Sequence, residues 1–280
     1  MKTFTTETNS LTALNNLFIE LTAQNCNRRC KHCYIDFPFQ KNVKDFISID
    51  KIRDALNDLK NENIQIIYLT GAEPMTHPDF NAILRLCLKK AAVCICTNAS
   101  FINEKKARFL KKVEGEGENE IIFKLSLDHY DEMKNDEIRC RGAYRETLNA
   151  IKNLIKYDFN PIISVVNYYN EPEPILVKEY KKIFDKIGFK ISSINLQINQ
   201  YHDRYKDWPE NEIIKADKKY DCSCGRILTK KGVYTCPFLS NDHRGWSGCD
   251  FKNFSVKNSL ESEFCHTCAH NKNKIFGLNL

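Results

Sequence analysis

The chain has 280 residues, of which 42% are apolar and 28% charged, with a formal net charge of +6. This apolar content is enough to bury a core, which excludes a largely disordered chain. No apolar run approaches the ~20 residues of a membrane span, and the polar N-terminal segment lacks the apolar stretch of a signal peptide, so we expect a cytoplasmic protein. The excess of 42 basic over 36 acidic residues is mild and scattered, which favours a solvated surface over a nucleic-acid groove.

Strand and helix patterns alternate over the first two-thirds of the chain. Apolar runs predict strands over 17–22, 64–70, 92–97, 120–128, 161–167 and 193–199. Helical spacing predicts helices over 48–61, 78–90, 104–112, 143–157 and 174–187. This alternation predicts an α/β fold with a parallel sheet. Six strands are too few for a closed eight-stranded barrel, which leaves a partial barrel or a doubly wound sheet, with its chemistry at the C-terminal strand ends.

The composition changes after residue 200. Residues 203–221 are polar and charged and are typical of a linker, and a short hairpin is predicted over 227–235 with Gly232 at its turn. We therefore expect a core domain over 1–200, a linker over 201–221 and a small cysteine-rich domain over 222–280.

Cysteine is the unusual residue, with 13 in the chain. An odd number cannot pair completely, and disulfides are rare in a reducing compartment, so the clustered cysteines are expected to be metal ligands. Cys26, Cys30 and Cys33 follow the first predicted strand. Three thiolates on one loop suit a [4Fe–4S] cluster whose fourth iron stays open for another ligand. A zinc site with His32 as a fourth ligand is the alternative.

Four motifs, in chain order, resemble those of the radical S-adenosylmethionine (SAM) superfamily. The loop at 26–34 resembles its CxxxCxΦC motif, and 70–74 (TGAEP) resembles its GGEP motif. Residues 96–99 (CTNA) resemble its TNG-like turn, and 125–128 (LSLD) resemble its ribose-contacting segment. Their order and placement at strand ends favour this family over a zinc site.

The resemblance implies a partial (β/α)6 barrel and a definite chemistry. The open iron would bind the amino and carboxylate groups of SAM, and the reduced cluster would cleave SAM to a 5′-deoxyadenosyl radical that abstracts hydrogen from a substrate. Glu73 is expected to meet the SAM ammonium, and Ser126 and Asp128 the ribose. Arg139 and Arg141 are candidates for a contact with the carboxylate, or else surface arginines. The full set of residues implied for SAM binding is His32, Tyr34, Gly71, Ala72, Glu73, Pro74, Asn98, Ser126, Asp128, Arg139 and Arg141.

A second group of cysteines lies in the tail, at positions 222, 224, 236, 249, 265 and 268. A cysteine pair across a hairpin plus a CxxC forms a four-thiolate site for zinc or for iron and sulfur. The arrangement resembles the twitch domain, the shortened form of the SPASM extension. That resemblance implies an auxiliary [4Fe–4S] cluster on Cys222, Cys236, Cys265 and Cys268, with Cys224 as the alternative to Cys222.

The remaining thiols have two interpretations. Cys224 and Cys249 are candidate hydrogen-atom donors to a substrate radical, or else unused thiols. The others, at positions 87, 94, 96 and 140, are expected to be packing residues.

We expect an enzyme that modifies a ribosomally made peptide by a crosslink, an epimerisation or an oxidation, with electrons from a flavodoxin- or ferredoxin-type donor. The alternative is a dehydrogenase of a small sugar-like or aminocyclitol alcohol. A non-enzymatic iron–sulfur or zinc scaffold for nucleic acid is the minor alternative.

Overall fold

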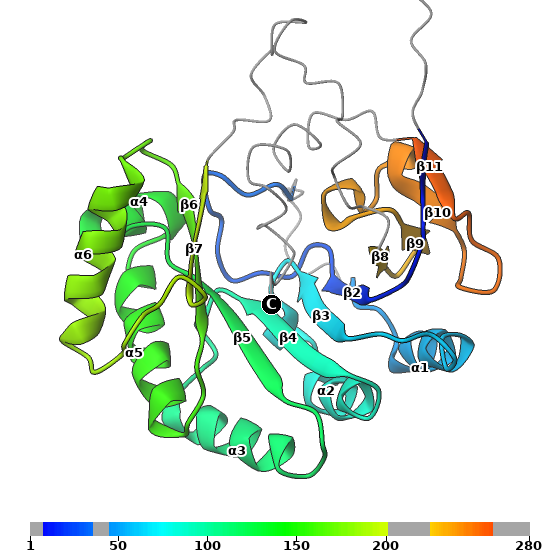
Figure 1. Cartoon of the computed structure of the whole chain (residues 1–280), viewed down its shortest axis with the longest axis horizontal. Coiled ribbons are helices and arrows are strands. Elements are labelled where there is room, and N and C mark those ends of the chain that lie inside the picture. The colour runs from blue at the N-terminus through cyan, green and yellow to red at the C-terminus, as the bar shows by residue number, and fades with distance from the viewer. Residues whose placement is uncertain (1–7, 36–44, 201–224, 260–280) are drawn as a thin grey trace, which may run out of the picture.

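The structure is a computed structural model that describes residues 8–35, 45–200 and 225–259. Within them one sheet has nine strands in the order β10-β9-β8-β2-β3-β4-β5-β6-β7 (Figure 1). Its six parallel barrel strands are β2 (Asn16–Thr22), β3 (Ile66–Gly71), β4 (Ala92–Thr97), β5 (Ile121–Ser126), β6 (Ile162–Asn167) and β7 (Leu196–Gln200). All six lie where the sequence predicts them, and β7 and β10 do not pair within the described residues, so the sheet is open.

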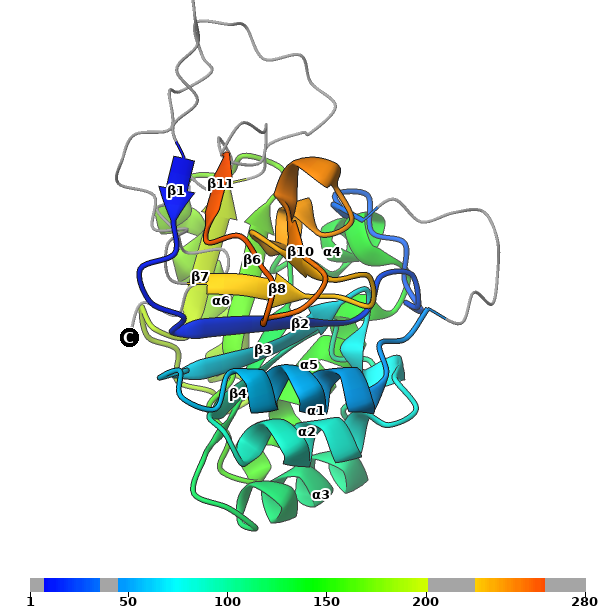
Figure 2. The same cartoon turned by 90° about the vertical axis from the view of Figure 1, so that its right-hand side faces the viewer.

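Helices alternate with these strands as predicted. They are α1 (Ile49–Asp58), α2 (Phe80–Leu88), α3 (Glu104–Glu114), α5 (Ala143–Lys156) and α6 (Glu173–Asp185). Figures 1 and 2 show them along one face of the curved sheet, which is the arrangement of a partial (β/α)6 barrel and not of a doubly wound sheet. None of the described helices is long and apolar enough to cross a membrane.

The two faces of the sheet have different cores. Leu17, Ile19 and the equivalent residues of the other strands pack against the helices in the larger core. Because strand side chains alternate between faces, Phe18 and Tyr68 point into the barrel, where their rings stack at 4.5 Å. Residues two positions further along these strands face the same interior, nearer the C-terminal ends.

The predicted hairpin is confirmed, and its pairing extends the sheet. Strands β8 (Gly225–Leu228) and β9 (Val233–Tyr234) are antiparallel, and β10 (Trp246–Gly248) follows β9. β8 also pairs in parallel with β2, from Asn16 opposite Gly225 to Ile19 opposite Leu228 (Figure 2). The hairpin is thus a direct continuation of the barrel sheet. The linker predicted over 201–221 lies outside the described residues, and the division into domains stays a prediction.

Three further elements have no counterpart in the sequence-based prediction. Helix α4 (Glu132–Arg139) begins at Asp131, whose side chain accepts a hydrogen bond from the backbone N–H of Lys134. Strands β1 (Thr8–Ser10) and β11 (Lys257–Ser259) pair antiparallel as a separate two-stranded sheet.

Candidate functional site

The loop after β2 brings the three N-terminal cysteines together. Cys26, Cys30 and Cys33 are partly buried. Burial raises the pKa of all three thiols, to about 11 for Cys33. The charge of Cys30 raises the pKa of both other thiols, so the three lie within electrostatic range of one another at the C-terminal end of the sheet.

This donor set fits an iron–sulfur cluster better than a single ion. Among the described residues, no three His, Cys, Asp or Glu side chains converge closely enough to hold one metal ion. A [4Fe–4S] cluster does not require such convergence, since its thiolates are distributed over a cube of iron and sulfur. His32, the fourth ligand in the zinc alternative, instead places Nε2 2.7 Å from Asp128 Oδ2, which disfavours zinc.

The Glu73 carboxylate links the C-terminal ends of β3 and β4 through hydrogen bonds. Its side chain is fully buried, and Oε1 accepts hydrogen bonds from the Thr97 hydroxyl at 2.7 Å and the Met75 backbone N–H at 3.1 Å. Oε2 accepts from the Asn98 backbone N–H at 2.8 Å. Burial raises the pKa of Glu73, while these hydrogen bonds oppose the rise. Pro74 follows as the first residue of a short 3-10 helix. A contact of Glu73 with a SAM ammonium stays a prediction.

Of the two departures from the family motifs, Ala72 has a backbone explanation and Ala99 does not. Gly71 has φ +114°, and a Cβ there would lie 2.3 Å from the Thr22 carbonyl oxygen, so only glycine fits. Ala72 donates its N–H to the same oxygen at 2.8 Å and lies outside the left-handed region, which makes alanine acceptable. Ala99, by contrast, adopts φ +69°, where glycine is the favoured residue.

The Asp128 carboxylate, just after the end of β5, has three polar partners. Its Oδ2 lies 2.6 Å from Arg139 Nη1 and 2.7 Å from His32 Nε2, and its Oδ1 accepts from the Val166 backbone N–H at 3.0 Å. Burial alone would raise the pKa of Asp128, but His32 and Arg139 outweigh it and hold the pKa well below its ordinary value. The structure therefore joins three of the predicted SAM-binding residues in one network, whereas Arg141 is exposed.

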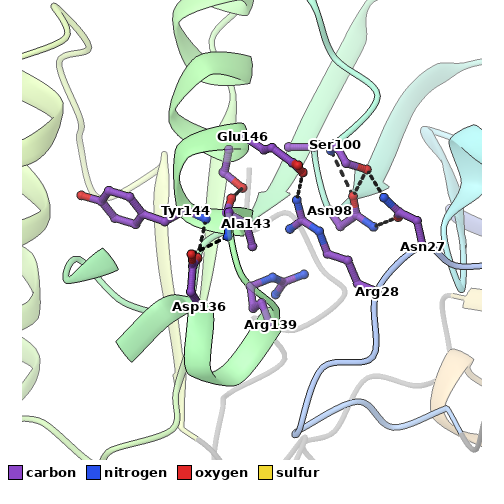
Figure 3. A network of polar contacts seen from close by, with 12 residues as sticks. Asn27, Arg28, Asn98, Ser100, Asp136, Arg139, Ala143, Tyr144 and Glu146 are labelled. Atoms are coloured by element: carbon purple, nitrogen blue, oxygen red, sulfur yellow. Dashed lines mark hydrogen bonds and ion pairs between the residues drawn. The ribbon is translucent and has the colours of Figure 1, made fainter. Parts of the chain in front are cut away.

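The other predicted SAM-binding residues surround the loop. Asn98 donates to Asn27 Oδ1 at 2.9 Å and lies 3.7 Å from the Cys26 sulfur (Figure 3). The Tyr34 ring packs edge-on against Phe238 at 5.3 Å. Ser126 pairs with Ser164 in the sheet and is partly exposed.

Only two of the six tail cysteines lie within the described residues. Cys222, Cys224, Cys265 and Cys268 lie outside the described residues, and Cys236 is half-buried directly after β9. Cys249 is exposed. Burial lowers the pKa of Lys51 on α1 and the charge of Cys249 opposes this, so Cys249 lies near the helical side of the sheet. That position gives no support to hydrogen donation inside the barrel, and the role stays a prediction.

The four cysteines expected to be packing residues differ in how far they are buried. Cys87 and Cys94 are buried as expected, and Cys96 is half-buried. Cys140 is exposed, so the packing interpretation is wrong there: it follows the last turn of α4, a helix that sequence patterns do not predict.

Sequence reasoning missed several polar groups inside the barrel. Glu20 and Lys124 are almost fully buried and occupy inward positions on β2 and β5. Gln197 and Asn199 alternate with Leu196 and Ile198, which pack on the helices, so both amides face inward. These residues could have been recognised in the sequence, because they are polar residues at inward-facing positions of otherwise apolar strands.

Glu20 connects the barrel to the tail. Its carboxylate accepts from the Ser240 hydroxyl at 2.7 Å and from the Asn241 side-chain amide at 3.1 Å. Burial raises the pKa of Glu20 above its ordinary value of 4.5, against the opposing effect of both hydrogen bonds.

Glu20→Gln is expected to remove a pH-dependent loss of stability. Because the folded-state pKa is raised, the native state keeps a proton that the unfolded chain has lost, and stability falls as pH rises above about 4.5. Glutamine carries no charge. Its side-chain oxygen can accept from the Asn241 amide, and its side-chain N–H groups can donate to the Ser240 hydroxyl oxygen. Urea unfolding at about pH 5 and about pH 8 should show that the free energy of unfolding of the variant, relative to that of the wild type, is larger at the higher pH. A pH-independent difference, or the same gain for the exposed Glu62→Gln, would contradict this.

Comparisons with known proteins identify a family and several relatives. The family model described as "Radical SAM superfamily" matches residues 21–175. AlbA of Bacillus subtilis, an antilisterial bacteriocin subtilosin biosynthesis protein, is 29% identical over 137 residues, 48% of this chain and 29% of its own length. GTP 3′,8-cyclase of Campylobacter jejuni (strain RM1221) is 24% identical over 266 residues, 91% of this chain and 76% of its own length. The chain thus spans less than a third of AlbA.

Solved structures share the fold at low identity. The structure "Native anSMEcpe with bound AdoMet" has a TM-score of 0.63 at 16% identity, covering 93% of this chain and 82% of that one. Streptococcus suis SuiB bound to precursor peptide SuiA has a TM-score of 0.63 at 14% identity, covering 88% and 64%. These likenesses establish the fold alone. The match of the family model over more than half of the chain, on the barrel and cysteine loop described above, shows that the chain belongs to the radical SAM superfamily.

Proposed function

We propose that this chain reductively cleaves SAM and uses the resulting radical to modify a peptide, with a [4Fe–4S] cluster on Cys26, Cys30 and Cys33. The observation that carries the first part is the position of these thiols, gathered on one loop at the C-terminal end of β2 in a radical SAM fold. The cluster supplies the electron that breaks the carbon–sulfur bond of SAM.

The protein supplies binding and orientation. We assign the SAM ammonium to the neighbourhood of Glu73 and the ribose to Ser126 and Asp128. Asp128 is held ionised by His32 and Arg139, and its Oδ1, which accepts one hydrogen bond from Val166, has acceptor capacity for one hydroxyl group. With Arg139 engaged by Asp128, a contact with the SAM carboxylate requires another of its N–H groups, and its buried Nε has no hydrogen-bond partner within the described residues.

A peptide substrate is supported by relatives and by the barrel interior. AlbA is named for bacteriocin biosynthesis, and SuiB was solved with a precursor peptide. Asn199 Oδ1 and Gln197 Oε1 are buried and have no hydrogen-bond partner in the described part of the chain. Buried acceptors need donors, and the backbone N–H groups of a peptide provide them.

A small molecule is the second candidate substrate. The GTP 3′,8-cyclase of Campylobacter jejuni matches 91% of this chain, whereas AlbA matches 48%. The buried Lys124 ammonium suits an anionic substrate of this class.

The tail and the electron donor complete the proposal. We infer an auxiliary [4Fe–4S] cluster on Cys236, Cys265, Cys268 and either Cys222 or Cys224, within a twitch-like domain over 222–280. A flavodoxin- or ferredoxin-type protein is the inferred donor, since the family requires low-potential electrons.

Anaerobic reconstitution tests these statements together. About eight irons per chain would support two clusters, and about four would leave the tail as a zinc or metal-free module. The substrate class is then decided by 5′-deoxyadenosine formation from SAM with GTP or with a synthetic peptide encoded beside the gene. We expect the peptide to accelerate formation at least tenfold and to be recovered as a modified product, detected by mass or by chiral amino-acid analysis. Acceleration by GTP alone would replace the peptide proposal by the second candidate.

A further inference from the structure

Arg28 is an arginine buried inside the cysteine loop. It lies between Cys26 and Cys30 in a strongly polar stretch, yet its side chain is only 1% exposed. Within the described residues its ion pair is with Glu146 on α5, at 2.6 Å from Nη2, and Glu146 itself is 53% exposed. Figure 3 shows Arg28 reaching from the loop to α5, with Arg139 beside it.

Most of the hydrogen-bonding capacity of Arg28 is unused. Its Nε and Nη1 are buried and have no hydrogen-bond partner within the described residues. A buried donor without an acceptor is destabilising, so an orphaned guanidinium points to an acceptor that occupies the site in the working protein.

The geometry of the loop indicates what that acceptor is. The backbone N–H of Arg28 donates to Cys26 Sγ at 3.4 Å, so the residue lies directly beside a proposed cluster ligand. The exposed neighbour Arg29 instead donates Nη1 to the backbone carbonyl oxygens of Cys26 and Arg28. Of these two adjacent arginines, only Arg28 combines burial with free donors.

We propose that Arg28 compensates the negative charge of the loop-bound cluster and raises its reduction potential, and that Glu146 moderates this effect. The inference rests on the cluster assignment proposed above. Reduction adds one electron, delivered by a low-potential donor, to an already anionic cluster. A buried cation and its N–H groups stabilise the reduced form more than the oxidised form, while a carboxylate paired with that cation acts in the opposite direction.

This pairing predicts shifts of opposite sign. Arg28→Gln should lower the reduction potential, because the cation is lost. Glu146→Gln should raise it, because the cation loses its counter-charge. A merely structural role for the ion pair would move both variants in the same direction, since either change breaks the same contact.

The experiment is a potentiometric titration of the anaerobically reconstituted full chain, followed by electron paramagnetic resonance. The loop cluster is identified as the signal that changes on addition of SAM. At a fixed potential, we expect Arg28→Gln to lower the ratio of reduced to oxidised cluster about tenfold, equal to 59 mV for a one-electron couple. Arg28→Lys should restore part of it, and Glu146→Gln should raise the ratio about threefold. The matched control, Arg29→Gln, removes the same charge at an exposed position and should change the ratio less than twofold.

An unchanged potential in Arg28→Gln, or shifts of the same sign in both variants, overturns the inference while leaving the proposed function intact. If Arg28→Gln does not retain its cluster, Glu146→Gln decides: a raised potential supports the inference, and an unchanged or lowered one overturns it. Absence of a SAM-responsive signal in the wild type contradicts the proposed function itself, and the inference with it.

Discussion

Replacing Cys26, Cys30 and Cys33 together by alanine is expected to reduce 5′-deoxyadenosine formation from SAM by at least about a thousandfold. The three thiols are the ligands proposed for the cluster, and no fourth cysteine lies on their loop. Without thiolates the cluster is not bound, and without the cluster no electron reaches SAM. The measurement is the amount of 5′-deoxyadenosine formed under reducing, oxygen-free conditions, together with iron content.

The matched control for this loss is Cys87→Ala. Cys87 is buried on α2, and its pKa is raised to about 12 by burial alone. Its removal should cost a little stability and leave SAM cleavage within twofold of the wild type. The triple variant should also lose about four irons and keep any iron bound in the tail. Continued 5′-deoxyadenosine production by it would refute the assignment of these cysteines.

Glu73→Ala is expected to lower the free energy of unfolding by about 3 kcal/mol or more and to abolish SAM cleavage. The carboxylate accepts three hydrogen bonds in a fully buried position, from Thr97, Met75 and Asn98. Alanine leaves these donors without acceptors, and it loosens β3 against β4 beside the cysteine loop. Urea unfolding measures the first effect and 5′-deoxyadenosine formation the second.

Glu104→Ala provides the comparison for Glu73. Glu104 pairs with Lys156 at 2.6 Å on the surface, with both side chains more than half exposed. Exposed ion pairs contribute little, so this change should leave the free energy of unfolding close to that of the wild type. If the two variants were equally stable, the hydrogen bonds of Glu73 would not have the structural importance assigned to them here.

The barrel itself could be predicted because its signals are local. Each of the six parallel strands is a short apolar run followed by a helix with a clear apolar face, so periodicity alone located them. Helix α4 was missed because its sequence, EMKNDEIR, is mostly polar and buries few apolar side chains. Its position next to the loop is nevertheless important, since it ends in Arg139.

The sequence was enough to predict the proposed cluster ligands, but not the buried charged residues around the site. Cysteine spacing identifies the loop, but nothing in the sequence NRRC distinguishes the buried Arg28 from the exposed Arg29. The same holds for Glu20, whose partners Ser240 and Asn241 lie about 220 residues away. Contacts of this range depend on how the sheet is assembled, which patterns of neighbouring residues do not report.

The pairing of β8 with β2 has a consequence for how the protein is made. β2 leaves the ribosome before the other barrel strands, and one of its two edges is covered only when residues 225–228 follow, about 200 residues later. At a synthesis rate of about 5–20 residues per second, that edge stays open for roughly ten seconds or longer. An open strand edge is a template for pairing with other chains, so nascent chains of this protein are expected to depend on chaperones during that interval.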